Sequence, residues 1–152
     1  MKMTTSIYEA YQYNMEFFCS FAMKAETELI KPVSKGKWSI KEIIGHIYFW
    51  DLFLLENMVP EMKDNGVLPD FPDHDSYNEK AMESIKSFKD TNSLIEAFVI
   101  TRNKLMDKME SLDQEVTFTI GKNKRNYTPE SFLRMFVEHD MHHIKQIKSL
   151  AD

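Results

Sequence analysis

The sequence predicts an all-α fold, a bundle of four long helices in one domain. The 152 residues include only four glycines and five prolines, too few for a fold with many tight turns. Helix-start motifs recur along the chain, and the segments between them carry apolar stripes at helical spacing. We therefore treat residues 1–152 as a single four-helix-bundle domain with a short additional helix.

Capping boxes mark the expected helix starts. In this motif a serine or threonine at the N-cap and a glutamate three residues later bond each other's free backbone N–H groups. The pattern occurs at Ser6–Glu9, Ser39–Glu42, Ser76–Glu79 and Ser93–Glu96. Thr128 followed by Pro129 marks a further start, because proline suits the first helical position.

The apolar stripes give the extent of each helix. We expect the long helices at 7–30, 40–58, 94–112 and 129–150, with the short helix at 77–88. The first is defined by an inward stripe of Met15, Phe18, Ala22, Ala25 and Leu29, and it ends before Pro32 and Gly36.

Two connections stand out. Residues 59–75 contain three prolines and Gly66, which predicts a long irregular segment, either functional or a plain surface crossover. On length alone this segment is our candidate for the mouth of a pocket. Residues 116–127 alternate apolar and polar side chains around a Gly-Lys-Asn-Lys turn, which predicts a small β-hairpin before the last helix.

Composition excludes several classes of partner. The net charge is −5 and no lysine or arginine run occurs, so we expect neither nucleic acid nor an anionic membrane as a partner. We see no apolar stretch long enough for a membrane span and no signal peptide, and we expect a cytoplasmic protein. Cys19, the single cysteine, excludes an intrachain disulfide and any site built from several thiolates.

Three histidines interrupt the apolar stripes of two helices. His139 and His143 lie one turn apart in the last helix, so their side chains share a face. That face is otherwise apolar, with Phe132, Met135, Phe136, Ile147 and Leu150. His46 occupies the same kind of position within the inward stripe of 40–58. Three inward histidines on two helices therefore point into one bundle.

This arrangement predicts a metal site. Burying three imidazoles together is costly unless something offsets the loss of water, and a divalent metal does so because neutral imidazole is a natural ligand. Three histidine ligands leave coordination positions open for water or substrate, which is typical of catalytic rather than structural sites. Imidazole binds zinc, nickel, copper and iron alike, so the ligand set does not identify the metal. A satisfied core histidine remains the alternative for each residue taken singly.

Other side chains near these histidines are candidates to orient the imidazole rings or to pack beside them. Gln146 shares the face of His143, and Glu42 lies one turn before His46 but is already explained by its capping box. His142 lies at the edge of the stripe and is expected at the surface or beside the site. His74, between two aspartates, is expected to be solvated, and Trp38 and Trp50 are expected to pack, with Trp50 as a candidate cavity wall.

Two further patterns have alternative interpretations. Asp140 makes the segment HDMHH a faint echo of the HExxH metalloprotease motif, which we disfavour because aspartate is shorter than the glutamate base. The opposite face of the last helix is also apolar, at Leu133, Val137, Met141 and Ile144. It packs either against another helix of the bundle or against a second copy in a homodimer.

Two segments of the chain resemble the signatures of the DinB/YfiT-like family of bacterial helical-bundle proteins. Residues 38–47 read WSIKEIIGHI and residues 139–147 read HDMHHIKQI, in the order that the family shows. The chain length and the expected helix count agree with the family. One departure is Lys145, where relatives often carry glycine, and it removes no ligand.

The resemblance implies a bundle with up-down-down-up topology, often dimeric. It also implies a divalent metal, commonly nickel or zinc with iron or manganese as alternatives, on His46, His139 and His143. The family includes bacillithiol S-transferases and mycothiol-dependent isomerases, in which the metal activates a low-molecular-weight thiol. No motif in this chain selects a thiol such as bacillithiol.

Three functions follow from these expectations. The leading hypothesis is a metal-dependent enzyme that transfers a thiol to a small electrophilic substrate in stress or detoxification. The second is a metal-dependent hydrolase that activates water, although no clear proton-transfer residue is evident beyond Glu42 or an acid in a loop. The third is a non-catalytic metal-binding or ligand-binding stress protein.

Overall fold

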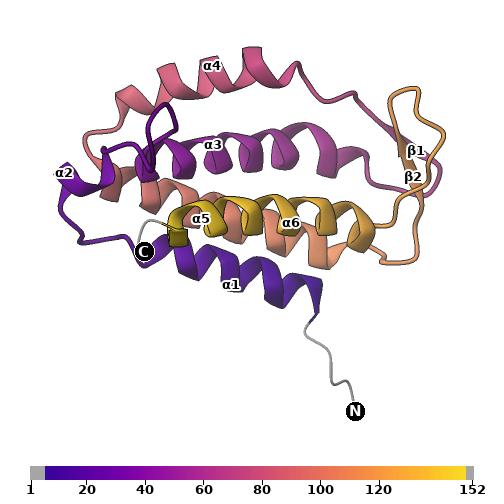
Figure 1. The fold of residues 1–152 in the computed structure, drawn as a ribbon. Coiled ribbons are helices and arrows are strands. Elements are labelled where there is room, and N and C mark those ends of the chain that lie inside the picture. The colour runs from indigo at the N-terminus through magenta and orange to yellow at the C-terminus, as the bar shows by residue number, and fades with distance from the viewer. Residues whose placement is uncertain (1–5, 150–152) are drawn as a thin grey trace.

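Four long helices form the body of the molecule in the computed structural model, which describes residues 6–149. They are α1 (Ile7–Cys19), α3 (Ile40–Phe53), α5 (Thr91–Ser111) and α6 (Pro129–Lys148). Figure 1 shows α1 and α6 running in one direction and α3 and α5 in the other. The predicted up-down-down-up four-helix bundle is thus confirmed.

A crossover makes this topology feasible. Because α3 and α5 lie side by side in parallel, the chain must return along the bundle between them. The short helix α4 (His74–Ser84), followed by a 3-10 turn at Ile85–Ser87, makes this return across the outer side of α3. The predicted short helix at 77–88 therefore exists but begins and ends earlier.

Local hydrogen bonding explains where the helices begin. Ser6, Ser39 and Thr128 cap α1, α3 and α6 as predicted, each accepting from a backbone N–H three residues on. The predictions for Ser76 and Ser93 are wrong. Asp73 and Asp90 are the N-caps, and their carboxylates accept from the N–H groups of those two serines. Aspartate caps as well as serine does, so each helix starts three residues earlier than the capping box indicated.

The predicted first helix, 7–30, is interrupted. α1 ends at Cys19, and only a four-residue helix, α2 (Glu26–Leu29), follows. Met23 has φ of 74°, which no α-helix accommodates, and its N–H donates to Asn92 Oδ1 on α5. Ala25 is consequently exposed, although Leu29 is buried as expected. The second helix does reach Met58, through a π-helical turn at Leu54–Met58, and continues as a 3-10 turn at Val59–Glu61.

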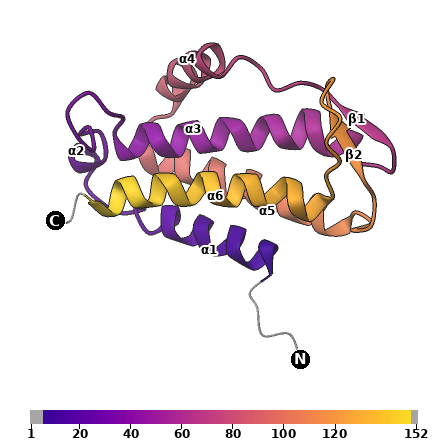
Figure 2. The same cartoon turned by 45° about the vertical axis from the view of Figure 1, so that its right-hand side comes forward.

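The predicted hairpin at 116–127 is mostly replaced by a parallel pair. β1 (Gly66–Leu68), inside the long 59–75 connection, pairs with β2 (Phe118–Ile120) in the register Gly66–Phe118 to Leu68–Ile120. Of the hairpin only one antiparallel bridge, Phe118 to Tyr127, remains. Leu68 and Phe118 are fully buried, so pairing with β1 closes one end of the bundle (Figure 2). Pairing between segments so far apart has no local signal in the sequence.

The second apolar face of α6 is covered within the chain. α1 packs along α6, and Leu133, Val137 and Ile144 are buried there, whereas Met141 remains 48% exposed. Of the two alternatives for this face, the structure shows the helix of the same bundle. No helix within residues 6–149 is long and apolar enough to cross a membrane.

Candidate metal centre

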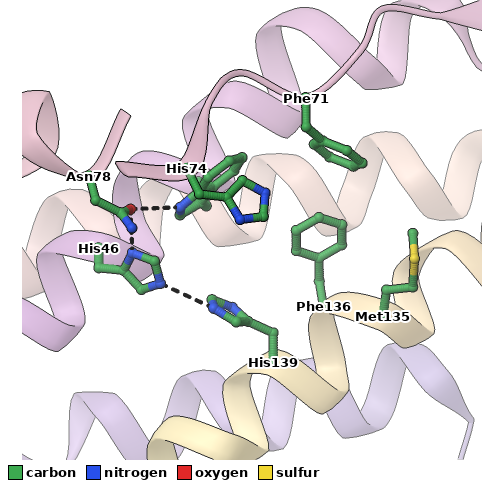
Figure 3. Close-up of a pocket in the computed structure, with 8 residues that line it drawn as sticks. His46, Phe71, His74, Asn78, Met135, Phe136 and His139 are labelled. Carbon is green, nitrogen blue, oxygen red and sulfur yellow. Dashed lines mark hydrogen bonds between the residues drawn. The ribbon is translucent and has the colours of Figure 1, made fainter. Parts of the chain in front are cut away.

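Three imidazoles meet where α3 faces α6. His46 comes from α3, and His139 and His143 come from successive turns of α6. The Nε2 atom of His139 lies 3.0 Å from that of His46 and 3.3 Å from that of His143. Figure 3 shows His46 and His139 pointing toward one another across the gap between the two helices. The three residues singled out in the sequence are thus brought together.

Side-chain amides orient two of the rings. Nδ1 of His46 lies 2.9 Å from Asn78 Oδ1, which also accepts from Trp50 Nε1 at 3.1 Å. Because the tryptophan N–H can only donate, the amide atom there is the oxygen, and His46 must donate its Nδ1 proton. Nδ1 of His143 is 2.7 Å from Gln146 Oε1, and because an amide oxygen only accepts, His143 donates there. Both histidines therefore turn an unprotonated Nε2 toward the centre.

Burial keeps the imidazoles neutral. It lowers the pKa of His46 to about 3, with help from the nearby charges that His139 and His143 would carry. Burial also lowers the pKa of His139 to about 4 and lowers that of His143. Neutral imidazole is the form that binds a metal, so the site is in its ligating state at neutral pH.

The cluster fits a metal ion in size and chemistry. The three ligand atoms lie within 4.8 Å of one another. In a tetrahedral zinc site, metal–nitrogen bonds of about 2.0–2.1 Å separate the nitrogens by about 3.3 Å. The two shortest separations here, 3.0 and 3.3 Å, are close to that value. The three residues therefore fit one divalent ion.

An aromatic cavity adjoins the cluster. It has a volume of about 260 Å³, and His46 and His139 form part of its lining. Trp50 supplies one apolar wall. Phe71 and Phe136 supply others (Figure 3). Trp50 is thus a cavity wall as well as a packing residue, and the 59–75 connection contributes Phe71. A ligand in this cavity would reach the cluster directly.

Trp38 packs against two rings of the cluster. Its ring centroid is 4.8 Å from that of His46 and 6.4 Å from that of His143, and it is stacked with the latter. A second hollow of about 200 Å³ lies there, lined by Trp38, His143 and Gln146 among others. Trp38 is therefore a packing residue, as predicted, and what it packs against is the imidazole cluster.

The structure separates the other sequence candidates. Gln146 does orient a cluster histidine, whereas Glu42 accepts from the backbone N–H of Ser39 and serves its capping box. His142 is exposed, with its ring 5.3 Å from that of His143. His74 is exposed as predicted but also lines the aromatic cavity, with its ring 5.3 Å from that of Trp50.

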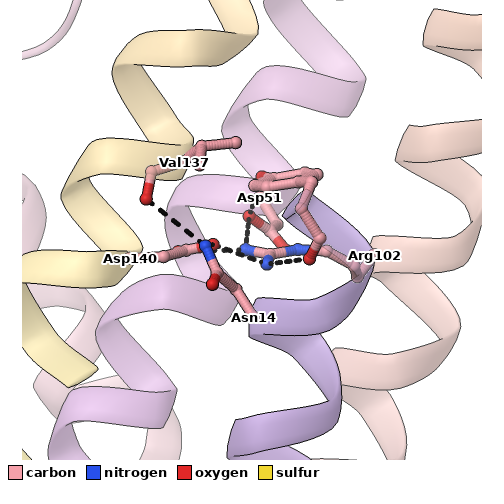
Figure 4. A network of polar contacts seen from close by, with 6 residues as sticks. Asn14, Asp51, Arg102, Val137 and Asp140 are labelled. Atoms are coloured by element: carbon pink, nitrogen blue, oxygen red, sulfur yellow. Dashed lines mark hydrogen bonds and ion pairs between the residues drawn. The ribbon is translucent and has the colours of Figure 1, made fainter. Parts of the chain in front are cut away.

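Sequence reasoning missed Asn78 and a buried ionic network. Arg102 on α5 is fully buried and binds the carboxylates of Asp51 on α3 and Asp140 on α6, each at 2.8 Å (Figure 4). Burial alone would lower the pKa of Arg102, but the two aspartates raise it well above its ordinary value. Asn14 on α1 donates to Asp140. Asp140 is therefore a partner of Arg102 and not a base of the metalloprotease type.

The sequence and the fold both have counterparts among known proteins. The family model of the DinB superfamily matches residues 22–147. The chain is also similar in structure to YfiT from Bacillus subtilis, described as a probable metal-dependent hydrolase with an unusual four-helix bundle topology. The TM-score is 0.59 at 16% identity, over 99% of this chain and 90% of that one. No curated protein matches the sequence significantly. The match over most of the chain shows that this protein belongs to the DinB superfamily.

Proposed function

We propose that this protein is a metal-dependent transferase that joins a low-molecular-weight thiol to a small electrophile. His46, His139 and His143 would hold the divalent ion, for which zinc and nickel are the leading candidates. The observation that carries the proposal is the convergence of three neutral imidazoles beside an apolar cavity. The bound ion would act as a Lewis acid and lower the pKa of a thiol.

In the overall reaction, the thiol loses its proton to solvent and its sulfur forms a bond to carbon. The bond between that carbon and the leaving group breaks, and the leaving group departs with the electron pair. The residues of the chain contribute orientation: Asn78 and Gln146 hold the two imidazole rings that they bond. The aromatic walls exclude water from the electrophile.

Transfer of a thiol is favoured over hydrolysis by the lining of the cavity. Hydrolases that activate water need a nearby group for proton transfer, and glutamate is the usual one. Among the described residues that line the cavity, none is a carboxylate. A thiol with a lowered pKa loses its proton at neutral pH without such a base. The cytoplasm, where thiols stay reduced, would be the place for this activity.

Metal-dependent hydrolysis is the second candidate, because one titratable group besides the cluster histidines lines the cavity. His74 stands beside Trp50 and could exchange a proton with a leaving group. The description of YfiT as a probable metal-dependent hydrolase points the same way. If the protein is a hydrolase, His74→Ala should lower the rate of ester hydrolysis. If it is a thiol transferase, His74→Ala should leave the rate of conjugation unchanged.

The first test is metal content. Elemental mass spectrometry of untagged protein should find about one transition metal per chain, lost in His139→Ala. Metal-loaded protein should then conjugate 1-chloro-2,4-dinitrobenzene with at least one of cysteine, glutathione, coenzyme A and bacillithiol. Metal binding without conjugation by any thiol would reject the transferase. Activity on an ester panel would then support the hydrolase, and inactivity there too would favour a non-catalytic binding protein.

A further inference from the structure

We propose that the aromatic cavity selects a planar, uncharged aromatic ring system as the part of the substrate that lies beside the metal centre. The inference deepens the proposed function, on which it rests for the identity of the cavity as the substrate site. It concerns the chemistry of the walls, which can be tested without knowing the reaction.

Three aromatic rings supply the apolar walls, inclined at 62° between Trp50 and Phe71 and at 48° between Phe71 and Phe136. Trp50, Phe71 and Phe136 line the cavity, with the Phe71 centroid 6.2 Å from that of Trp50 and 6.0 Å from that of Phe136. Aromatic rings interact best with other rings in offset or edge-to-face arrangements at such centroid distances. A planar ligand can meet these faces closely, whereas a puckered aliphatic one of equal volume cannot.

The walls are fixed before a ligand binds. The indole N–H of Trp50 donates to Asn78, so the ring cannot turn without breaking that bond. Phe71 stacks on buried Phe132, with an interplanar angle of 16° and a centroid distance of 6.3 Å. A preorganised pocket binds its ligand with less loss of side-chain freedom. Shape selection by these faces is therefore expected to be strong.

The charge around the cavity favours a neutral ligand. Among its described lining residues there is no lysine, arginine or carboxylate. A carboxylate held among the rings, out of reach of the divalent ion, would lose its water without gaining a partner. A cation would be attracted by the rings but repelled by the divalent ion at the imidazoles. A neutral ring system avoids both penalties.

The volume limits the size of that ring system. An apolar cavity of about 150 Å³ holds benzene. At about 260 Å³, this cavity has room for a substituted benzene or two fused rings. Naphthalene derivatives are therefore suitable probes.

The test compares three probes with the same ten-carbon bicyclic framework by isothermal titration calorimetry. 2-Naphthol is planar and neutral, decahydro-2-naphthol is neutral but not planar, and 2-naphthoate is planar but anionic. Protein treated with a chelator is used, because a metal ion would bind the carboxylate directly. We expect 2-naphthol to bind at least about five-fold more tightly than either analogue.

Variants locate the binding site. Phe136→Leu keeps an apolar side chain but removes one aromatic face, and should weaken 2-naphthol binding about five-fold. Phe88→Leu is the matched control, since Phe88 is also half-buried but lies outside the cavity, and should bind as the wild type does. Circular dichroism verifies that both variants fold.

Several results would overturn the inference. Equal binding of decahydro-2-naphthol would reject planarity, and equal binding of 2-naphthoate would reject the requirement for neutrality. If the protein takes up zinc but does not bind 2-naphthol, the inference is rejected and the proposed function stands. Binding of 2-naphthol by protein that takes up no metal would reject the proposed function and leave the selectivity of the cavity in place.

Discussion

Two polar clusters are buried in this bundle, and they are satisfied in opposite ways. The network around Arg102 contains its own counter-charges: five hydrogen bonds join its guanidinium to Asp51, Asp140 and the carbonyl of Tyr11. The imidazole cluster contains three ring nitrogens that face each other. The first cluster is complete within the chain, and the second is not.

The tautomers make this difference explicit. His46 and His143 donate their Nδ1 protons to Asn78 and Gln146, so each presents a lone pair at Nε2. His139 can donate one Nε2 proton to only one of them at good geometry. At least one buried lone pair is left without a proton donor from the cluster, and a cation is the group that satisfies all three at once. An incomplete polar cluster beside a cavity indicates a binding site. A complete one, such as the network around Arg102, indicates a purely structural role, which we call a structural tie between helices.

Loss of Arg102 should have the largest effect on stability. Arg102→Met leaves Asp51 and Asp140 buried without their cation, and removing one partner of a buried ion pair typically costs about 3–5 kcal/mol. We expect the free energy of unfolding, measured by urea denaturation, to fall by that amount or the variant not to fold. Arg134→Met is the control, because the ion pair of Arg134 with Glu130 is equally short but exposed, and should cost less than about 1 kcal/mol. Equal losses of stability in the two variants would show that the buried ion pairs contribute no more than the exposed one.

Metal should stabilise the protein through the other cluster. With zinc at about a thousand times its dissociation constant, linkage predicts about 4 kcal/mol of added stability, seen as a rise in Tm that a chelator reverses. In His139→Ala the rise should be lost. His142→Ala is the matched control, since His142 is exposed and adjacent to the cluster, and should keep the rise. A rise that survives in His139→Ala would place the zinc elsewhere.

The amide partners should have a smaller effect on the same quantity. Groups that orient a ligating histidine typically change metal affinity 10–100-fold when removed. Gln146→Leu and Asn78→Leu should weaken zinc binding within that range in a competition titration with a chromophoric chelator. Gln12→Leu, an exposed glutamine on α1, is the control and should bind zinc as the wild type does. Unchanged affinity in both variants would show that the rings are held by packing alone.

The sequence predicted the imidazole cluster because each of its histidines interrupts an apolar stripe within a single helix. His139 and His143 are one turn apart on an apolar stripe, and His46 lies in the stripe of another helix. The same signal was present for the ionic network. Arg102 lies between Phe98 and Leu105, and Asp51 between Ile47 and Leu54, at helical spacing in buried stripes. A charged residue on an inward stripe predicts a buried partner, although the partner cannot be named from one helix alone.

Other features depend on contacts that one segment does not encode. Capping by Ser39 and Thr128 is decided within four residues and was predicted, whereas the parallel pairing of β1 with β2 joins segments far apart in the chain. The break after Cys19 depends on a bond from Met23 to Asn92 on another helix. Asn78 reaches His46 only because α4 returns across α3. These features arise from tertiary contacts, which the periodicity of a single helix does not predict.

The smallest change in the free energy of unfolding is expected for a substitution in the imidazole cluster without metal, and it distinguishes the two clusters most directly. In metal-free protein, His139→Leu replaces a half-buried imidazole of the incomplete cluster by an apolar side chain of similar size. His139 donates at most one neutral hydrogen bond, and burial of the apolar leucine offsets its loss, so the free energy of unfolding should change by no more than about 1 kcal/mol. Asp140→Leu, at the adjacent position, removes a partner of Arg102 and should destabilise the protein by several times as much. Urea denaturation in the presence of a chelator measures both. A large loss in His139→Leu would mean that the imidazoles stabilise the bundle without metal, and the difference between a binding site and a structural tie would disappear.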